Sequence, residues 1–107
     1  MPLVKVMNLS REQTSAVAKN ILGDIATIAE VDESRFHFFH CGDSVFEDSL
    51  VLIEVLWYPR DKSKMKSVAE LLYNELKKHG NYNVDVVFHE LNSEKHYING
   101  EQHFPKK

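Results

Sequence analysis

Apolar residues recur at helical spacing in two segments of the chain, and each segment lies between two runs rich in β-branched and aromatic residues. The first helical set is Val17, Ala18, Ile21, Leu22, Ile25 and Ile28, and the second is Met65, Val68, Ala69, Leu72 and Leu76. The runs that predict strands span residues 2–7, 35–41, 50–58 and 84–91. The chain therefore predicts the order strand, helix, strand, followed by the same order again.

Residues typical of helix ends and turns mark the boundaries of these elements. Ser10 and Gln13 fit a capping box at the start of the first helix, and Asp61 or Ser63 can cap the second. Gly80 is a candidate for the position just after the second helix. The polar tail, residues 92–107, contains an Asn-Gly pair at 99–100 that predicts a tight turn.

The two halves repeat at a spacing of about 51 residues, which places Val17 on Val68 and Val4 on Val55. Each strand–helix–strand unit is expected to be right-handed and to make its two strands parallel. We therefore predict an α+β fold in a single domain spanning residues 1–107. Its two βαβ repeats form a four-stranded mixed sheet with two helices on one face.

The third predicted strand has apolar residues on both of its faces. Val51, Ile53, Val55 and Trp57 alternate with Leu50, Leu52, Glu54 and Leu56. One layer of helices covers only one face of a sheet, so the other face needs a different cover, and we expect a homo-oligomer. Lys5 and Glu54 interrupt this second face and can pair if the first and third strands are neighbours.

Composition and charge narrow the functional classes. The chain has 107 residues, is 43% hydrophobic and carries a formal net charge of −3. This balance is typical of a globular domain, and the negative charge argues against a nucleic-acid or anionic-membrane partner. A single cysteine, Cys41, excludes an intrachain disulfide. The first residues show no signal peptide, so we expect a cytoplasmic protein.

Pro2 is the first candidate for chemistry because removal of Met1 would leave a secondary amine at the start of a strand. Amino termini titrate at about 7.7–8.0, and burial lowers that pKa further. A proline nitrogen in an apolar pocket can therefore act as a neutral general base. The alternative is that Met-Pro is a start without function.

The proline start, the two βαβ halves and the chain length together resemble the tautomerase superfamily, which includes 4-oxalocrotonate tautomerase and macrophage migration inhibitory factor. Two segments, EVLWYPR at 54–60 and HYINGEQHF at 96–104, are similar to an uncharacterised bacterial branch of that superfamily. The resemblance covers essentially the whole chain. It implies a homotrimer with active sites between subunits, each built around the amino-terminal proline, and no cofactor.

The same resemblance implies which residues bind the substrate, a small-molecule carboxylate. Arg35 and Arg60 resemble the two substrate arginines of 4-oxalocrotonate tautomerase, and guanidinium groups suit bidentate contact with a carboxylate. Tyr97 is similar in place to an aromatic residue that packs against the catalytic proline. The alternatives are arginines paired with nearby acids such as Asp32 or Asp61, and a tyrosine that covers a neighbouring subunit.

Other chemistries fit the chain less well. His37 and His40 are three apart on a predicted strand and so point to opposite faces, and we expect no metal site. The same order of elements occurs in RNA-recognition modules, but the third strand, LVLIEVLWY, lacks their basic–glycine–aromatic signature. Two hypotheses remain: a proline-dependent tautomerase or isomerase, and a non-catalytic ligand-binding or structural trimer on the same fold.

Overall fold

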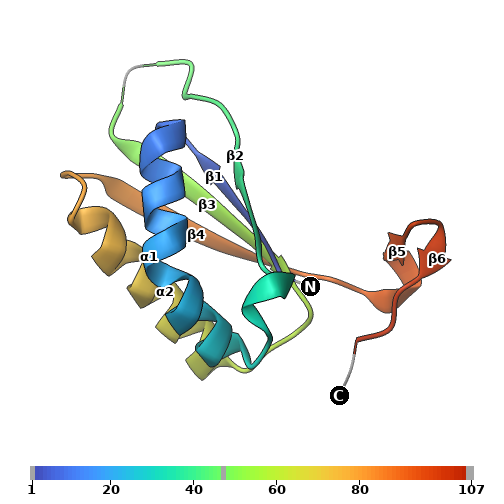
Figure 1. Cartoon of the computed structure of the whole chain (residues 1–107). Helices are drawn as coiled ribbons and strands as arrows, with labels where there is room; N and C mark the ends of the chain where they lie inside the picture. The colour runs from blue at the N-terminus through green and yellow to red at the C-terminus, as the bar shows by residue number, and fades with distance from the viewer. Residues whose placement is uncertain (1, 47, 106–107) are drawn as a thin grey trace.

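A four-stranded sheet with two helices packed side by side on one face forms the body of the molecule (Figure 1). The computed structural model describes residues 2–46 and 48–105. The elements of the body are β1 (Leu3–Met7), α1 (Arg11–Ala29), β2 (His37–His40), β3 (Leu50–Trp57), α2 (Lys62–Lys77) and β4 (Asn83–Glu90). The predicted α+β order is confirmed.

The sheet has the strand order β2-β1-β3-β4 and is mixed. β1 runs parallel to β2, β3 runs parallel to β4, and β1 and β3 are antiparallel at the centre. Each parallel pair is joined through one helix, as the two predicted βαβ units require. The central register pairs Val4 with Val55 and Lys5 with Glu54, so the two repeats meet at equivalent positions.

The core lies between the sheet and the helices. On the sheet, the inward residues Val4, Val51, Ile53, Val55 and Trp57 are fully buried. On the helices, the apolar residues predicted at helical spacing face the sheet, and six of them are buried: Val17, Ile21, Ile25, Val68, Leu72 and Leu76. Each such aliphatic side chain contributes about 1.5–3 kcal/mol when it leaves water, so this layer fixes which face of the sheet the helices cover.

The other face of the sheet carries apolar and charged residues together. Leu52 and Leu56 are half-buried, whereas Phe39 and Val87 are exposed. Lys5 Nζ lies 3.8 Å from Glu54 Oε1, and His89 Nε2 lies 2.7 Å from Glu54 Oε2. The predicted neighbouring strands and their ion pair are therefore confirmed, and His89 of β4 joins the pair.

Most strand boundaries differ from the sequence predictions by one residue, and the larger differences lie before β2 and after α2. Residues Glu33–Arg35 form a 3₁₀ turn, so β2 begins at His37 and Arg35 precedes it; the turn is capped by Asp32 Oδ1, which accepts a hydrogen bond from Ser34 N at 2.9 Å. Gly80 does not cap α2: the helix ends at Lys77, and its C-cap residue Lys78 has a right-handed conformation. At the end of α1 a non-glycine residue, Glu30, adopts the left-handed conformation with a φ of 58°.

The polar tail forms a short hairpin beside the body. A 3₁₀ turn at Ser93–Lys95 leads into β5 (Tyr97–Ile98) and β6 (Glu101–Gln102). Asn99 and Gly100 have φ values of 52° and 83°, as a type I′ turn requires, which confirms the predicted turn. Figure 1 shows this hairpin standing away from the sheet and the helices. In the described part of the chain, the helices are too short or too polar to cross a membrane.

Candidate functional site

The start of β1, the end of β3 and the 3₁₀ turn before β2 meet at one end of the sheet. The Pro2 side chain is fully buried there, and the Pro2 carbonyl oxygen accepts a hydrogen bond from His37 N at 3.2 Å. Since Leu3 pairs with His37 and with Leu56, the register places Pro2 in the row of Phe36 and Trp57. Pro2 therefore lies between β2, which follows Arg35, and β3, which precedes Arg60.

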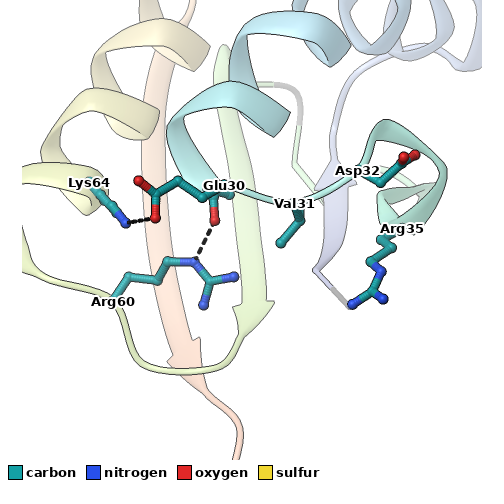
Figure 2. Close-up of a pocket in the computed structure, with 7 residues that line it drawn as sticks. Glu30, Val31, Asp32, Arg35, Arg60 and Lys64 are labelled. Atoms are coloured by element: carbon teal, nitrogen blue, oxygen red, sulfur yellow. Dashed lines mark hydrogen bonds and ion pairs between the residues drawn. The ribbon is translucent and has the colours of Figure 1, made fainter. Parts of the chain in front are cut away.

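A cavity of about 520 Å³ opens at this end of the molecule. Its lining consists of Ala29, Glu30, Val31, Asp32, Arg35, Arg60 and Lys64. Figure 2 shows Arg60 and Arg35 on opposite sides of Val31. The structure therefore brings the two arginines singled out in the sequence to one cavity, at the end of the sheet where Pro2 is buried, but Pro2 is not among the residues that line this cavity.

Arg60 is held in place by the backbone around it. Its Nε donates to the Ala29 carbonyl oxygen at 3.2 Å, and Nη1 donates to the Tyr58 carbonyl oxygen at 2.7 Å. The guanidinium carbon also lies 5.2 Å from the centre of the Trp57 ring, within cation–π range. Burial lowers the pKa of Arg60 from its ordinary value, while the charge of Glu30 opposes this effect. Nη2 makes no hydrogen bond within residues 2–46 and 48–105, so it can contact a ligand.

Arg35 is exposed at the end of the 3₁₀ turn. Among the described residues, neither arginine forms an ion pair with Asp32, Glu33 or Asp61. Asp32 instead caps the 3₁₀ turn, and the hydrogen bond from the Ser34 backbone lowers its pKa. Asp61 caps α2, and hydrogen bonds from the Ser63 hydroxyl and then from the Lys64 backbone lower its pKa. The alternative in which nearby acids neutralise the arginines is therefore not what the structure shows.

The remaining charges of the cavity are paired with each other. Lys64 Nζ lies 2.9 Å from Glu30 Oε2, and Figure 2 shows this contact above Arg60. Because the ion pair and the capped Asp32 are satisfied, the two guanidinium groups are the cationic groups left for a ligand in the described cavity. This arrangement suits a small organic acid.

Tyr97 takes a different position from the other predicted site residues. It lies on β5, in the hairpin that stands away from the body, and its side chain is 60% exposed (Figure 1). The isolated chain therefore leaves most of the Tyr97 ring open to contact with another copy.

A cluster of Tyr58, His96 and His103 lies next to this site and was not predicted from the sequence. The Tyr58 hydroxyl lies 2.7 Å from His96 Nδ1, and the three rings lie with centroids 5.2–5.7 Å apart. The only signal in the sequence was the two histidines that flank the predicted turn in HYINGEQH. No pattern linked them to a tyrosine at the end of a distant strand.

Trp57 contributes an unusual polar atom beneath Arg60. Its indole Nε1 is the one buried side-chain nitrogen or oxygen without a hydrogen-bond partner among the described residues. Leaving such a donor unpaired costs about 1–3 kcal/mol. Unpaired buried groups of this kind occur at functional sites, where stability is not the only constraint. The described residues contain no cluster of three or more histidine, cysteine, aspartate or glutamate side chains placed to hold a metal ion.

Solved structures share this fold. The structure of a DUF1904 protein from Sebaldella termitidis is 28% identical, with a TM-score of 0.89 over 96% of this chain and 100% of that one. A macrophage migration inhibitory factor homologue from Prochlorococcus marinus is 13% identical, with a TM-score of 0.76 over 94% of this chain and 97% of the other. Malonate semialdehyde decarboxylase, described with decarboxylase and hydratase activities, is 18% identical, with a TM-score of 0.71 over 91% and 90% of the two chains.

At these low identities, the structural similarity to the last two proteins shows a shared fold only. No curated protein sequence matches the chain. A family model described as a domain of unknown function, DUF1904, matches residues 1–103. The chain therefore belongs to the DUF1904 family and has the fold of the tautomerase and macrophage migration inhibitory factor superfamily.

Proposed function

We propose that this protein is a tautomerase-type enzyme that moves a proton within a small carbonyl-containing carboxylate. The observation that carries the proposal is the fully buried Pro2 at the end of the sheet where Arg35 and Arg60 line one cavity. In this proposal, removal of Met1 frees the Pro2 nitrogen. The arginines then hold the carboxylate of the substrate while the nitrogen reaches the neighbouring carbon.

The chemistry follows from the surroundings of Pro2. A secondary amine next to the apolar Phe36 and Trp57 is costly to charge, and this environment favours its neutral, basic form. The base takes a proton from the carbon beside the carbonyl group and returns it at another carbon. The Ala29 and Tyr58 carbonyls fix Arg60 before the substrate arrives, so little ordering is needed on binding.

We further propose that the active unit is a homotrimer and that Tyr97 serves the site of a neighbouring copy. The half-buried leucines on the outer face of the sheet support an oligomer, because the helices of the same chain do not cover them. The exposure of Tyr97 supports contact with another subunit. The number of subunits, three, is what the resemblance to the superfamily implies.

The second candidate is a protein that binds a small carboxylate without converting it. The two acids of the cavity favour this candidate because both already have partners: Glu30 pairs with Lys64, and Asp32 accepts a hydrogen bond from the Ser34 backbone. No other carboxylate lines the cavity among the described residues to supply a second acid–base group. Under this reading the arginines bind the ligand and Pro2 has a structural role only.

The experiment compares the native protein with Pro2→Ala on 2-hydroxymuconate, phenylpyruvate and a 3-halo-acrylate. Intact mass first establishes that Met1 has been removed. The tautomerase proposal predicts that Pro2→Ala lowers kcat/KM by about 100- to 10,000-fold, as expected for loss of a positioned base. Arg60→Gln is expected to raise KM chiefly, because it weakens binding of the carboxylate.

Arg11→Gln is the matched control, since Arg11 is exposed at the start of α1 and is absent from this cavity. Activity that survives Pro2→Ala would exclude the proline mechanism. Calorimetric binding that depends on Arg60, without turnover of any of the three substrates, would favour the binding protein.

A further inference from the structure

Two large apolar side chains project into solvent from the segment that joins β2 to β3. Val45 is 94% exposed and Phe46 is 79% exposed, more than any other large hydrophobic residue that the structure describes. Figure 1 shows residues 41–46 extending beyond the end of the sheet. At such exposure neither side chain packs on its own body, so this apolar tip, Val45 and Phe46, is available to another surface.

The segment that carries the apolar tip is tied to the body by Asn8, which directly follows β1. Asn8 Oδ1 accepts a hydrogen bond from Ser44 N at 3.0 Å, and Asn8 Nδ2 donates to the Leu50 carbonyl oxygen at 2.7 Å. The Asp48 carboxylate accepts from Asn8 Nδ2 at 3.0 Å and from the Ser44 hydroxyl at 2.9 Å. Because these contacts lie on both sides of the apolar tip, its exposure is built into the fold.

A groove of about 500 Å³ lies between α1 and the edge strand β2. Its lining includes the apolar Ala18, Phe38 and Phe39 and the cations Arg11 and Lys19, but no acid among the described residues. Neither cation forms an ion pair within residues 2–46 and 48–105. This α1–β2 groove therefore combines an aromatic surface with positive charge that no acid compensates.

The apolar tip and the α1–β2 groove are complementary in polarity and in charge. Asp43 and Asp48 flank the tip in the chain, and Asp43 forms no ion pair in the part of the chain that the structure describes. Opposite charges attract across an interface, and apolar side chains that meet there leave water. An acidic segment with an aromatic tip therefore suits a basic groove lined by phenylalanines.

A smaller cavity of about 250 Å³ at the base of the same segment is a poorer acceptor. Met7 and Leu52 give it apolar surface, but Asp43 and Asp48 also line it. A second copy whose tip entered this cavity would bring its own two acids against these two. Like charges that face each other disfavour such a contact, so the α1–β2 groove is the better match.

We propose that the apolar tip of one copy of this chain docks in the α1–β2 groove of a second copy. Phe46 then packs against Phe38 and Ala18. Asp43 approaches Lys19 at the side of the groove. The tip and the groove are different surfaces, so each copy gives its tip to one neighbour and its groove to another, and such head-to-tail contacts can close into a ring.

The inference rests on the oligomer of the proposed function, and it adds a contact that is separate from the outer face of the sheet. It does not require the protein to catalyse a reaction.

Isotope-filtered NMR on a mixture of 13C-labelled and unlabelled native protein tests the contact directly. Intermolecular NOEs are expected from the Phe46 ring of one copy to the Ala18 methyl group and the Phe38 ring of another. An oligomer without these NOEs would overturn the contact, as would NOEs from Phe46 to Met7 and Leu52 in their place. A native protein that sediments as a monomer at micromolar concentration would overturn this contact and the homotrimer together.

Removal of the aromatic tip tests its share of the association. Phe46→Ser is expected to weaken association by about 30-fold or more, as truncation of a buried aromatic anchor does. Tyr73→Ser is the matched control, because Tyr73 is an exposed aromatic residue on α2, outside the tip and the groove. Sedimentation equilibrium measures both variants. Equal association in Phe46→Ser and in the native protein would contradict the proposal.

Reversal of charge tests the pairing of Asp43 with Lys19. Lys19→Glu and Asp43→Lys are each expected to weaken association by about 3-fold or more at low salt, since each places like charges together. The variant with both changes restores the attraction and is expected to recover most of the loss. Arg11→Gln only neutralises one exposed charge, so its effect should stay below about 3-fold. Losses that add in the double variant would contradict the pairing.

These readouts separate the contact from the proposed activity. Intermolecular NOEs from Phe46 in a protein that turns over no substrate would uphold the contact and count against the enzyme. Turnover that depends on Pro2, in an oligomer without these NOEs, would uphold the enzyme and overturn the contact.

Discussion

At the scale of single residues, Glu75 shows how a charge is kept inside this molecule. The side chain lies between α1 and α2 and is 5% exposed. It accepts hydrogen bonds from Asn20 at 3.0 Å and His79 at 3.1 Å, and Lys78 lies 3.4 Å away. Burial raises the pKa of Glu75, but these partners outweigh it, and the net pKa lies below its ordinary value. Sequence periodicity places an acid at this position without showing that it is buried.

Glu75→Gln is expected to lower the free energy of unfolding by about 1–3 kcal/mol near neutral pH, because it weakens three contacts in a buried site. The folded pKa is lowered, so the contribution of the carboxylate is present above its ordinary 4.5 and lost as the pH falls through the lowered value. The gap between the two proteins should therefore close in acid. Urea unfolding at several pH values measures it.

Glu70→Gln is the control on the same helix, since Glu70 forms only an exposed pair with Lys66 at 3.9 Å. Its effect should stay below about 1 kcal/mol. A Glu75→Gln penalty that is unchanged at acid pH would contradict the assigned role of the charge.

At the scale of elements, side chains at the helix starts set the boundaries that the sequence predicted. Ser10 Oγ accepts from Gln13 N at 3.1 Å, and Asp61 Oδ1 accepts from Lys64 N at 3.0 Å. The Ser10 cap was readable in the sequence because it depends on residues three positions apart, whereas the sequence left Asp61 and Ser63 as alternative caps of α2. The 3₁₀ turn before β2 was missed, since its Asp32 cap spans only two residues inside a segment predicted as loop and strand.

Ser10→Ala is expected to destabilise the protein by about 0.5–2 kcal/mol, because it removes the hydroxyl that caps α1. Thermal unfolding should then show a Tm lowered by about 4–8 °C per kcal/mol. Ser15→Ala, at an exposed position inside the same helix, should leave the Tm unchanged or slightly raised, since alanine favours helix. Equal losses in both variants would argue against a capping role.

At the scale of the whole molecule, the helices cover one face of the sheet (Figure 1). Leu52 and Leu56, on the other face, are half-buried. Glu54 lies between these leucines, with Lys5 and His89 beside it. This mixture of apolar and paired charged groups is typical of a surface that meets another protein surface in one register. It is the physical basis for the proposed oligomer.

Leu52→Lys is expected to convert the proposed oligomer into monomers, because it buries a charge at the contact. The monomer should tolerate the change, since Asp85 is the cross-strand partner of Leu52 on β4. Sedimentation velocity measures the result. Tyr73→Lys, at an exposed position on α2, is the control. A native protein that sediments as a monomer at micromolar concentration would contradict the homotrimer.

The sequence by itself determined the elements, their order and the inward face of each. Periods of two and of about 3.6 residues separate strand from helix, and the βαβ rule makes each outer pair parallel. The proline at the start of a predicted strand was a local feature as well, whereas Arg35 and Arg60 were singled out by the superfamily resemblance. Their nearness follows from the topology, which brings the start of β1 and the end of β3 to one end of the sheet.

Only the tertiary structure decided which groups touch. Arg60 donates hydrogen bonds to the carbonyl oxygens of Ala29 and Tyr58, and Tyr58 forms a hydrogen bond with His96. Glu75 is buried against Asn20 of the other helix. Most of these contacts join residues that lie far apart in the chain. Such contacts depend on the packed fold, which fixes the position and the orientation of each side chain. A pattern of apolar and polar positions sets the face on which a side chain lies, whereas its partner depends on the whole arrangement of the fold.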